Sequence, residues 1–132
     1  MVTLIDSSAW IEFLRGDRGG DPSIRASVRG LLGDGGALTE PVVMEVLAGA
    51  RSGAHGEQLQ LLLGRAELLP LEVEDWASAA VLHRQCRANG LTIRSMVDCL
   101  VAAVAIRHGV PVLARDRDFE VIAAHSRLVL AA

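Results

Sequence analysis

The spacing of apolar residues along the chain predicts short strands that alternate with amphipathic helices. Residues 2–5 form a short β-rich apolar run that closes at Asp6, and we expect the first strand there. Apolar side chains then recur at helical spacing over residues 10–14, and either Ser7 or Ser8 is available as the N-cap of that helix. The start of the chain therefore reads as a strand followed directly by a helix.

The rest of the chain continues this alternation, with glycine-rich or polar breaks between the elements. The further expected helices cover residues 24–32, 41 to 49 or 53, 59–63, 75–88 and 95–108, and the further expected strands cover residues 68–71, 110–114 and 128–130. Such alternation is typical of a parallel sheet with helices on both faces. We therefore predict an α/β fold, and one domain over residues 1–132 because the chain is too short for two.

Asp98 is an acidic residue in a helix that is otherwise apolar. It is the only charge between Arg94 and Arg107, and a helix of this composition is buried nearly all round. A buried carboxylate needs a hydrogen-bond partner, a counter-charge or a cation. One interpretation is a capping box over residues 95–98, in which the acid reaches back to the start of the helix. The other is a bound metal ion.

Four further acidic residues occupy positions where they can approach Asp98. Asp6 ends the first expected strand, Asp116 follows the strand expected over residues 110–114, and Asp118 comes two residues later. Each is typical of a cap or turn residue when taken alone. In a parallel sheet, however, the carboxyl ends of the strands form the ligand-binding edge. Glu45 lies between apolar neighbours in the third expected helix, which disfavours a fully solvated position.

Taken together, these acids predict a cation site. Converging carboxylates repel one another and take up protons unless a cation neutralises them. A site made only of carboxylates selects a hard cation, Mg²⁺ or Mn²⁺ as its substitute, and the four histidines show no metal-ligand spacing that would favour zinc. The chemistry that such a site favours is hydrolysis of a phosphodiester bond.

Composition narrows the class of partner and the location. The net charge of −3 excludes a uniformly basic nucleic-acid binder, but all 13 basic residues are arginine and a local patch can still bind phosphate. An apolar content of 51% is high for a small domain and favours a dimer interface or a protein partner. No membrane span, signal peptide or C-x-x-C pattern is evident, and Cys86 and Cys99 are typical of buried thiols. We expect a cytoplasmic protein with no membrane contact.

Four segments of the sequence resemble PIN domains, and within that family the VapC toxins. They span residues 4–11, 41–45, 94–103 and 112–119, and their order and spacing match over essentially the whole chain. The resemblance implies a PIN-like fold and a Mg²⁺-dependent endoribonuclease that acts as the toxin of a toxin–antitoxin pair. It also implies an RNA substrate, a homodimer, and a VapB-like antitoxin whose C-terminal tail blocks the site.

The same resemblance assigns roles to individual residues. It makes Asp6, Glu45, Asp98 and Asp116 the catalytic acidic quartet, with Asp6 and Asp98 as the most direct metal ligands. Glu45 and Asp116 complete the metal site through bound water or a second ion. Two further positions match by resemblance: a frequent fifth acid at Asp118, and a small hydroxyl residue kept beside the site at Ser8.

The basic residues near these motifs are candidates for contact with RNA. Arg94, Arg115 and Arg117 could guide the RNA backbone, Arg94 could instead pair with an acid to hold the site together, and Arg15 is a weaker candidate.

Two other functional classes are alternatives. One is an aspartyl phosphatase or receiver-like domain, but the phosphatase pattern needs a second acid where Ser8 stands. The other is a catalytically silent RNA- or protein-binding PIN module, which the presence of every expected acid disfavours.

Overall fold

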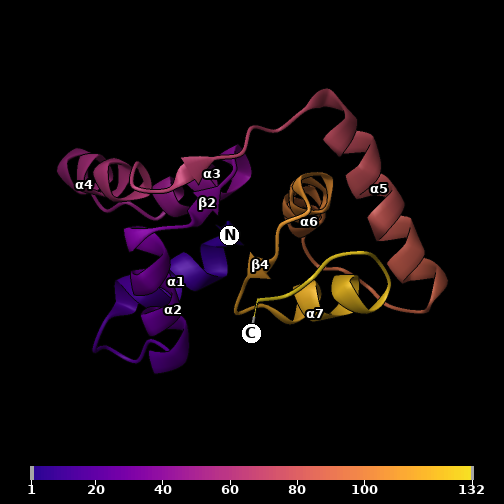
Figure 1. Ribbon diagram of the computed structural model, residues 1–132, viewed down its shortest axis with the longest axis horizontal. Coiled ribbons are helices and arrows are strands. Elements are labelled where there is room, and N and C mark those ends of the chain that lie inside the picture. The colour runs from indigo at the N-terminus through magenta and orange to yellow at the C-terminus, as the bar shows by residue number, and fades with distance from the viewer. Residues whose placement is uncertain (1, 132) are drawn as a thin grey trace.

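The computed structural model describes residues 2–131, so Met1 and Ala132, the two ends of the predicted domain, lie outside the described residues. Within that range strands and helices alternate (Figure 1), which confirms the predicted α/β class. The strands are β1 (Thr3–Ile5), β2 (Gly36–Leu38), β3 (Glu67–Leu68) and β4 (Val112–Leu113). The helices are α1 (Ser7–Arg15), α2 (Pro22–Gly33), α3 (Glu40–Ala48), α4 (Gly53–Leu63), α5 (Val73–Ala88), α6 (Met96–His108) and α7 (Arg117–Ala124).

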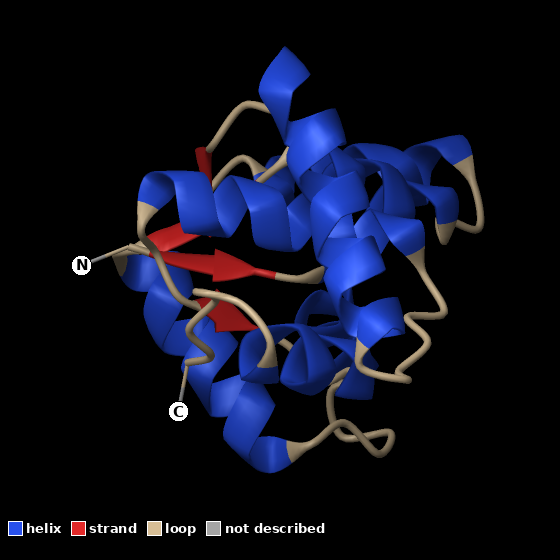
Figure 2. Cartoon of the chain, turned by 90° about the vertical axis from the view of Figure 1, so that its right-hand side faces the viewer, coloured by secondary structure: helices blue, strands red, loops and turns tan. Residues whose placement is uncertain are grey.

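The strands form one parallel sheet in the order β3-β2-β1-β4. In its register, Thr3 of β1 pairs with Gly36 on one side, and Ile5 pairs with Leu113 on the other. Helices lie on both sides of the strands (Figure 2), as the alternation predicted. Because β1 and β4 are neighbours and run in the same direction, the residues that follow them emerge at the same edge of the sheet.

Strand β2 is missing from the strands predicted above, where the glycines around Gly36 belong to a glycine-rich break after the helix expected over residues 24–32. Gly36 is buried, and a Cβ atom at this position would lie only 2.9 Å from the carbonyl oxygen of Leu31. The position therefore needs glycine for close packing of β2 against the end of α2. Three residues are too few to show the alternation by which a strand is recognised in a sequence.

Two other strand predictions need adjustment. The strand expected over residues 68–71 lies at Glu67–Leu68, and the chain then leaves the sheet at Pro70. The strand expected over residues 128–130 is reduced to one parallel bridge between Leu130 and Val112. The sheet edges are thus shorter than the apolar runs suggested.

Helix α6 lies in the middle of the molecule, between β4, α5 and α7 (Figure 1), and it carries Asp98 in its first turn. Every residue from Asp98 to Ala105 is buried, as the composition of this segment predicted. Cys86 of α5 and Cys99 of α6 are buried free thiols, also as expected. No helix among residues 2–131 is long and apolar enough to cross a membrane.

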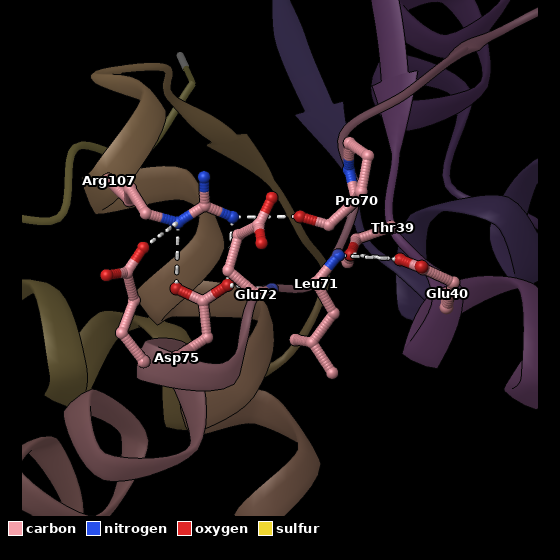
Figure 3. A network of polar contacts seen from close by, with 8 residues as sticks. Thr39, Glu40, Pro70, Leu71, Glu72, Asp75 and Arg107 are labelled. Atoms are coloured by element: carbon pink, nitrogen blue, oxygen red, sulfur yellow. Dashed lines mark hydrogen bonds and ion pairs between the residues drawn. The ribbon is translucent and has the colours of Figure 1, made fainter.

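The far end of α6 fixes the connection between β3 and α5 (Figure 3). The Arg107 guanidinium donates hydrogen bonds to both carboxylate oxygens of Asp75, at 3.0 and 2.9 Å, and to the carbonyl oxygen of Pro70 at 2.8 Å. Burial opposes ionisation of Asp75, but the bonds and charge of Arg107 outweigh burial and lower the pKa of Asp75. The Leu71 amide donates to Glu40 at the start of α3. This connection therefore ties α3 to α6, the helices that carry Glu45 and Asp98.

Candidate active site

Asp6 and Asp116 follow the neighbouring strands β1 and β4 and lie at the same edge of the sheet. The Asp6 amide donates a 2.9 Å hydrogen bond to the carbonyl oxygen of Leu113, which continues the pairing of the two strands. The Asp6 side chain is 1% exposed. The prediction that these strand ends bring acids to one edge therefore agrees with the geometry.

Asp6, rather than Ser7 or Ser8, is the N-cap of α1. Its Oδ2 accepts hydrogen bonds from the Ser8 amide at 3.0 Å and from the Ser8 hydroxyl at 2.7 Å, whereas its Oδ1 is buried and has no partner among the described residues. Burial raises the pKa of Asp6 to about 6, against the lowering effect of the Ser8 bonds, and the charge of Glu45 adds to the rise. Ser8 thus fixes one oxygen of Asp6 and leaves the other available.

Asp98 does not form the capping box that the sequence allows. Ser95 is the N-cap of α6 but makes no side-chain cap bond, and Asp98 Oδ2 is buried with no hydrogen-bond partner in the described part of the chain. Burial and, to a smaller extent, the negative charges of the surrounding acids together raise the pKa of Asp98 to about 8. This arrangement favours the alternative interpretation, in which a cation compensates the carboxylate.

Three of the predicted acids come together closely. Asp98, Asp116 and Asp118 each offer a carboxylate oxygen, and these atoms lie within 4.8 Å of one another. The set joins the first turn of α6 to the start of α7, a helix that the sequence analysis did not anticipate. Asp116 is the N-cap of α7 and accepts a 2.9 Å bond from the Asp118 amide, so the turn-capping alternative offered for Asp118 is wrong. Asp118 instead accepts a 3.0 Å bond from the Arg94 amide.

Asp6 and Glu45 do not belong to this close set, but both lie near Asp98, since their negative charges contribute to the rise in its pKa. Glu45 is partly buried on α3 and accepts a 2.9 Å hydrogen bond from the Ser7 hydroxyl. The sequence analysis considered Ser7 only as a helix cap and missed this contact. A serine next to a strand-end acid is a weak signal, since the pairing depends on how α1 and α3 pack.

The candidate RNA-binding arginines differ in their surroundings. Arg94 Nε lies 3.8 Å from Asp118 Oδ1, which agrees with the alternative role of Arg94 in pairing with an acid. Arg115 pairs with Asp21 at 3.3 Å, and Arg117 is exposed at the start of α7. Arg15 pairs with Glu12 on its own helix.

The donor set suits a hard divalent cation. Two buried carboxylate oxygens, one from Asp6 and one from Asp98, have no partner among the described residues, and three further acids surround them. Burial raises the pKa of the neighbouring Cys99 thiol to about 12, so this sulfur is protonated at neutral pH and is a poor ligand. Oxygen ligands of this kind match Mg²⁺ or Mn²⁺.

Comparison with known proteins gives a consistent result. The family profile described as PIN domain matches residues 3–125. The VapC ribonuclease Mb1587 of Mycobacterium bovis is 42% identical over 127 residues, covering 92% of this chain and 92% of that protein.

Solved structures share the fold. VapBC2 from Rickettsia felis, bound to a DNA fragment from its promoter, superposes with a TM-score of 0.76 at 17% identity and covers 99% of this chain and 98% of that chain. VapBC-5 from Mycobacterium tuberculosis, a member of the VapBC family of toxin–antitoxin systems, superposes with a TM-score of 0.66 at 20% identity, covering 99% and 98%.

Proposed function

The chain belongs to the PIN-domain family and to its VapC ribonucleases, and from this premise we propose that it is a Mg²⁺-dependent endoribonuclease toxin. The observation that carries the proposal is the group of acids around Asp98. Their carboxylate oxygens approach one another without a counter-charge sufficient to balance them, and Asp98 Oδ2 has no hydrogen-bond partner among residues 2–131. A divalent cation would balance this charge.

The residues divide into those that would hold the cation and those that hold the acids in place. Asp6, Glu45, Asp98 and Asp116 are the proposed catalytic acids, and Asp118 is a further proposed ligand. A divalent cation bound there supplies positive charge for in-line hydrolysis of an RNA phosphodiester, and Mn²⁺ can replace Mg²⁺.

The chain's own side chains prepare the site for that cation. Ser8 occupies Asp6 Oδ2 with two hydrogen bonds, so that Oδ1 remains the free donor atom. Arg94 holds Asp118 through its backbone amide and its guanidinium. Because burial raises the pKa of Asp98 to about 8, a cation that binds at neutral pH would displace the proton of this carboxyl, whereas Asp6, with a pKa of about 6, is already mostly ionised.

We also propose a VapB-like antitoxin as the partner, a homodimer as the assembled form and the cytoplasm as the location. The named VapC relative and the VapBC structural neighbours support the toxin–antitoxin assignment. Exposed apolar side chains support a protein interface, since Val73 is 89% exposed and Trp76 is 60% exposed on α5.

Cleavage of total cellular RNA by the purified protein tests the proposal, with Mg²⁺ and with EDTA. The test variant is Asp98→Asn, and the matched control is Asp17→Asn, which removes the same charge from a fully exposed position just after the C-terminal end of α1. We expect discrete fragments from the wild type and from Asp17→Asn, and none with EDTA or with Asp98→Asn. Metal-independent cleavage, or full activity of Asp98→Asn, would contradict the proposed site. No cleavage by folded, antitoxin-free protein would favour a binding module.

A further inference from the structure

Arg115 is held at its backbone by the candidate active site. Its amide donates a 2.8 Å hydrogen bond to the Ser8 hydroxyl oxygen, and the same hydroxyl donates a 2.7 Å hydrogen bond to Asp6 Oδ2. The backbone of Arg115 is therefore connected to a proposed catalytic acid through one side chain. The next residue, Asp116, belongs to the close acidic set.

The other end of Arg115 is held by Asp21, at the start of α2. Arg115 Nη1 lies 3.3 Å from Asp21 Oδ2. The other carboxylate oxygen of Asp21, Oδ1, caps α2: it accepts hydrogen bonds from the amides of Ser23 and Ile24 at 2.9 and 3.2 Å. Its own amide donates to Glu12 Oε2 at 2.8 Å. Asp21 is thus fixed by α1 and α2, and its Oδ2 remains for the guanidinium.

This ion pair contributes little to folding stability, because the Arg115 side chain is 59% exposed and pairs of that kind are strongly screened by water. Its effect is on orientation. A guanidinium has five N–H donors, and the contact with Asp21 leaves most of them free. Arg117 makes no ion pair with the described residues, so Arg115 is the more firmly placed of the two cations beside Asp116.

A hollow of about 430 Å³ lies next to this guanidinium. Arg115, Asp116, Arg117 and Glu120 line its polar part, while the partly buried Ile24 and Leu130 contribute apolar surface. Small-molecule sites in proteins have volumes of about 300–1,000 Å³, and one nucleotide fits within that range. The hollow therefore offers apolar surface for a base, and the Arg115 guanidinium, held by Asp21, for a phosphate, although Asp116 and Glu120 also line it.

We propose that this hollow binds the nucleotide next to the cleaved bond, that Arg115 holds its phosphate, and that Asp21 positions Arg115. The inference rests on the proposed ribonuclease function. A phosphate that approaches several carboxylates is repelled, and a guanidinium at the edge of the acidic site offsets that repulsion with paired N–H donors. The contact with Asp21 keeps the Arg115 guanidinium from pairing with the neighbouring carboxylate of Asp116. The positive charge of Arg115 therefore stays at the hollow, where the RNA phosphate would bind.

The variant Asp21→Asn tests the positioning role, because asparagine keeps the Oδ1 cap of α2 and removes only the charge that holds Arg115. Asp17→Asn is the matched control, since Asp17 lies in the same loop region and pairs with Arg25 at 3.2 Å. Steady-state cleavage of a short single-stranded RNA is measured for both variants, in the wild-type background and in the Arg115→Gln background. Thermal unfolding is measured in parallel.

We expect Asp21→Asn to raise KM about three- to tenfold with little change in kcat, and to have no further effect once Arg115 is replaced. Asp17→Asn should stay within about twofold of wild type, and the melting temperature should not change. An effect of Asp21→Asn that is equal to that of Asp17→Asn, or that persists in the Arg115→Gln background, would overturn the positioning role. Absence of cleavage by the wild type would instead refute the proposed function, which separates the two failures.

Discussion

The Ser7 hydroxyl donates a 2.9 Å hydrogen bond to Glu45 Oε1 and so joins the first turn of α1 to α3 across 38 positions of the sequence. Ser7 is buried, with 8% of its surface exposed. The contact fixes Glu45, which lies within α3, whereas the other candidate acids lie at strand ends or in α6 and α7. It gives Glu45 a defined orientation in a partly buried environment.

Ser7→Ala should weaken cation binding, because Glu45 loses the bond that orients its carboxylate. We expect the Mg²⁺ concentration for half-maximal RNA cleavage to rise about tenfold, and the free energy of unfolding to fall by about 1 kcal/mol. A Mg²⁺ titration of cleavage measures the first effect. Ser78→Ala, at an exposed position on α5, is the control, and identical Mg²⁺ curves for the two variants would show that the bond has no role in the site.

Ser8→Ala should shift the pH dependence of cleavage to higher pH. The Ser8 hydrogen bonds lower the pKa of Asp6, so removal of the hydroxyl raises that pKa and demands a higher pH for ionisation. We expect the acidic limb of the profile to move by about 0.5–1 pH unit. Ser8→Thr keeps a hydroxyl and should keep the limb near its wild-type position. If the acidic limb of the Ser8→Ala profile does not shift, ionisation of Asp6 does not control the pH dependence of cleavage.

Asp98→Asn should stabilise the metal-free protein at neutral and alkaline pH. The folded-state pKa of Asp98 is raised to about 8, so ionisation of Asp98 opposes folding. The native state binds this proton more tightly than the unfolded state, and stability therefore falls as the pH rises from about 4 towards that folded-state value. Asparagine removes this dependence, and we expect a gain of about 1–3 kcal/mol near pH 8 and little change near pH 4.

Thermal unfolding with EDTA at these two pH values measures the effect, and added Mg²⁺ gives a second readout. Mg²⁺ should raise the melting temperature of the wild type, because it binds the native state, and should have a smaller effect on Asp98→Asn. A wild-type melting temperature that does not respond to either pH or Mg²⁺ would contradict an uncompensated acidic site.

Arg107→Ala should destabilise the fold without changing the chemistry of the site. Asp75 is 1% exposed, and removal of its partner leaves a buried carboxylate uncompensated. We expect a loss of about 2–4 kcal/mol in the free energy of unfolding. Because the pairing lowers the pKa of Asp75, its contribution is present at neutral pH and is lost as the pH falls through that lowered pKa. Chemical denaturation measures both effects.

Arg87→Ala, an exposed arginine at the end of α5, is the control for that experiment and should change stability by less than about 0.5 kcal/mol. RNA cleavage below the melting temperature should remain in Arg107→Ala. A loss of activity in protein shown to be folded would mean that the β3–α5 connection also sets the geometry of the acids.

The sequence by itself was sufficient for the features that depend on local pattern. The apolar run before Asp6 and the one before Asp116 identified β1 and β4, and the uncharged segment around Asp98 identified α6 as buried. Parallel strands send their ends to one edge, so the meeting of acids there also followed from chain order. These inferences succeed because hydrophobic periodicity is set by neighbouring residues.

The tertiary structure alone decided which hydrogen-bond partner each polar group takes. Both α1 and α7 begin at an aspartate cap, and the serine–aspartate box before α6 is not formed, although all three patterns look equally suitable in the sequence. The start of strand β2 packs closely against the end of α2 because Gly36 carries no Cβ atom, and no apolar repeat in the sequence reveals this contact. The partners of Glu45 and Arg115, namely Ser7 and Asp21, are brought to them by helix packing, and such long-range contacts depend on the whole fold rather than on local pattern.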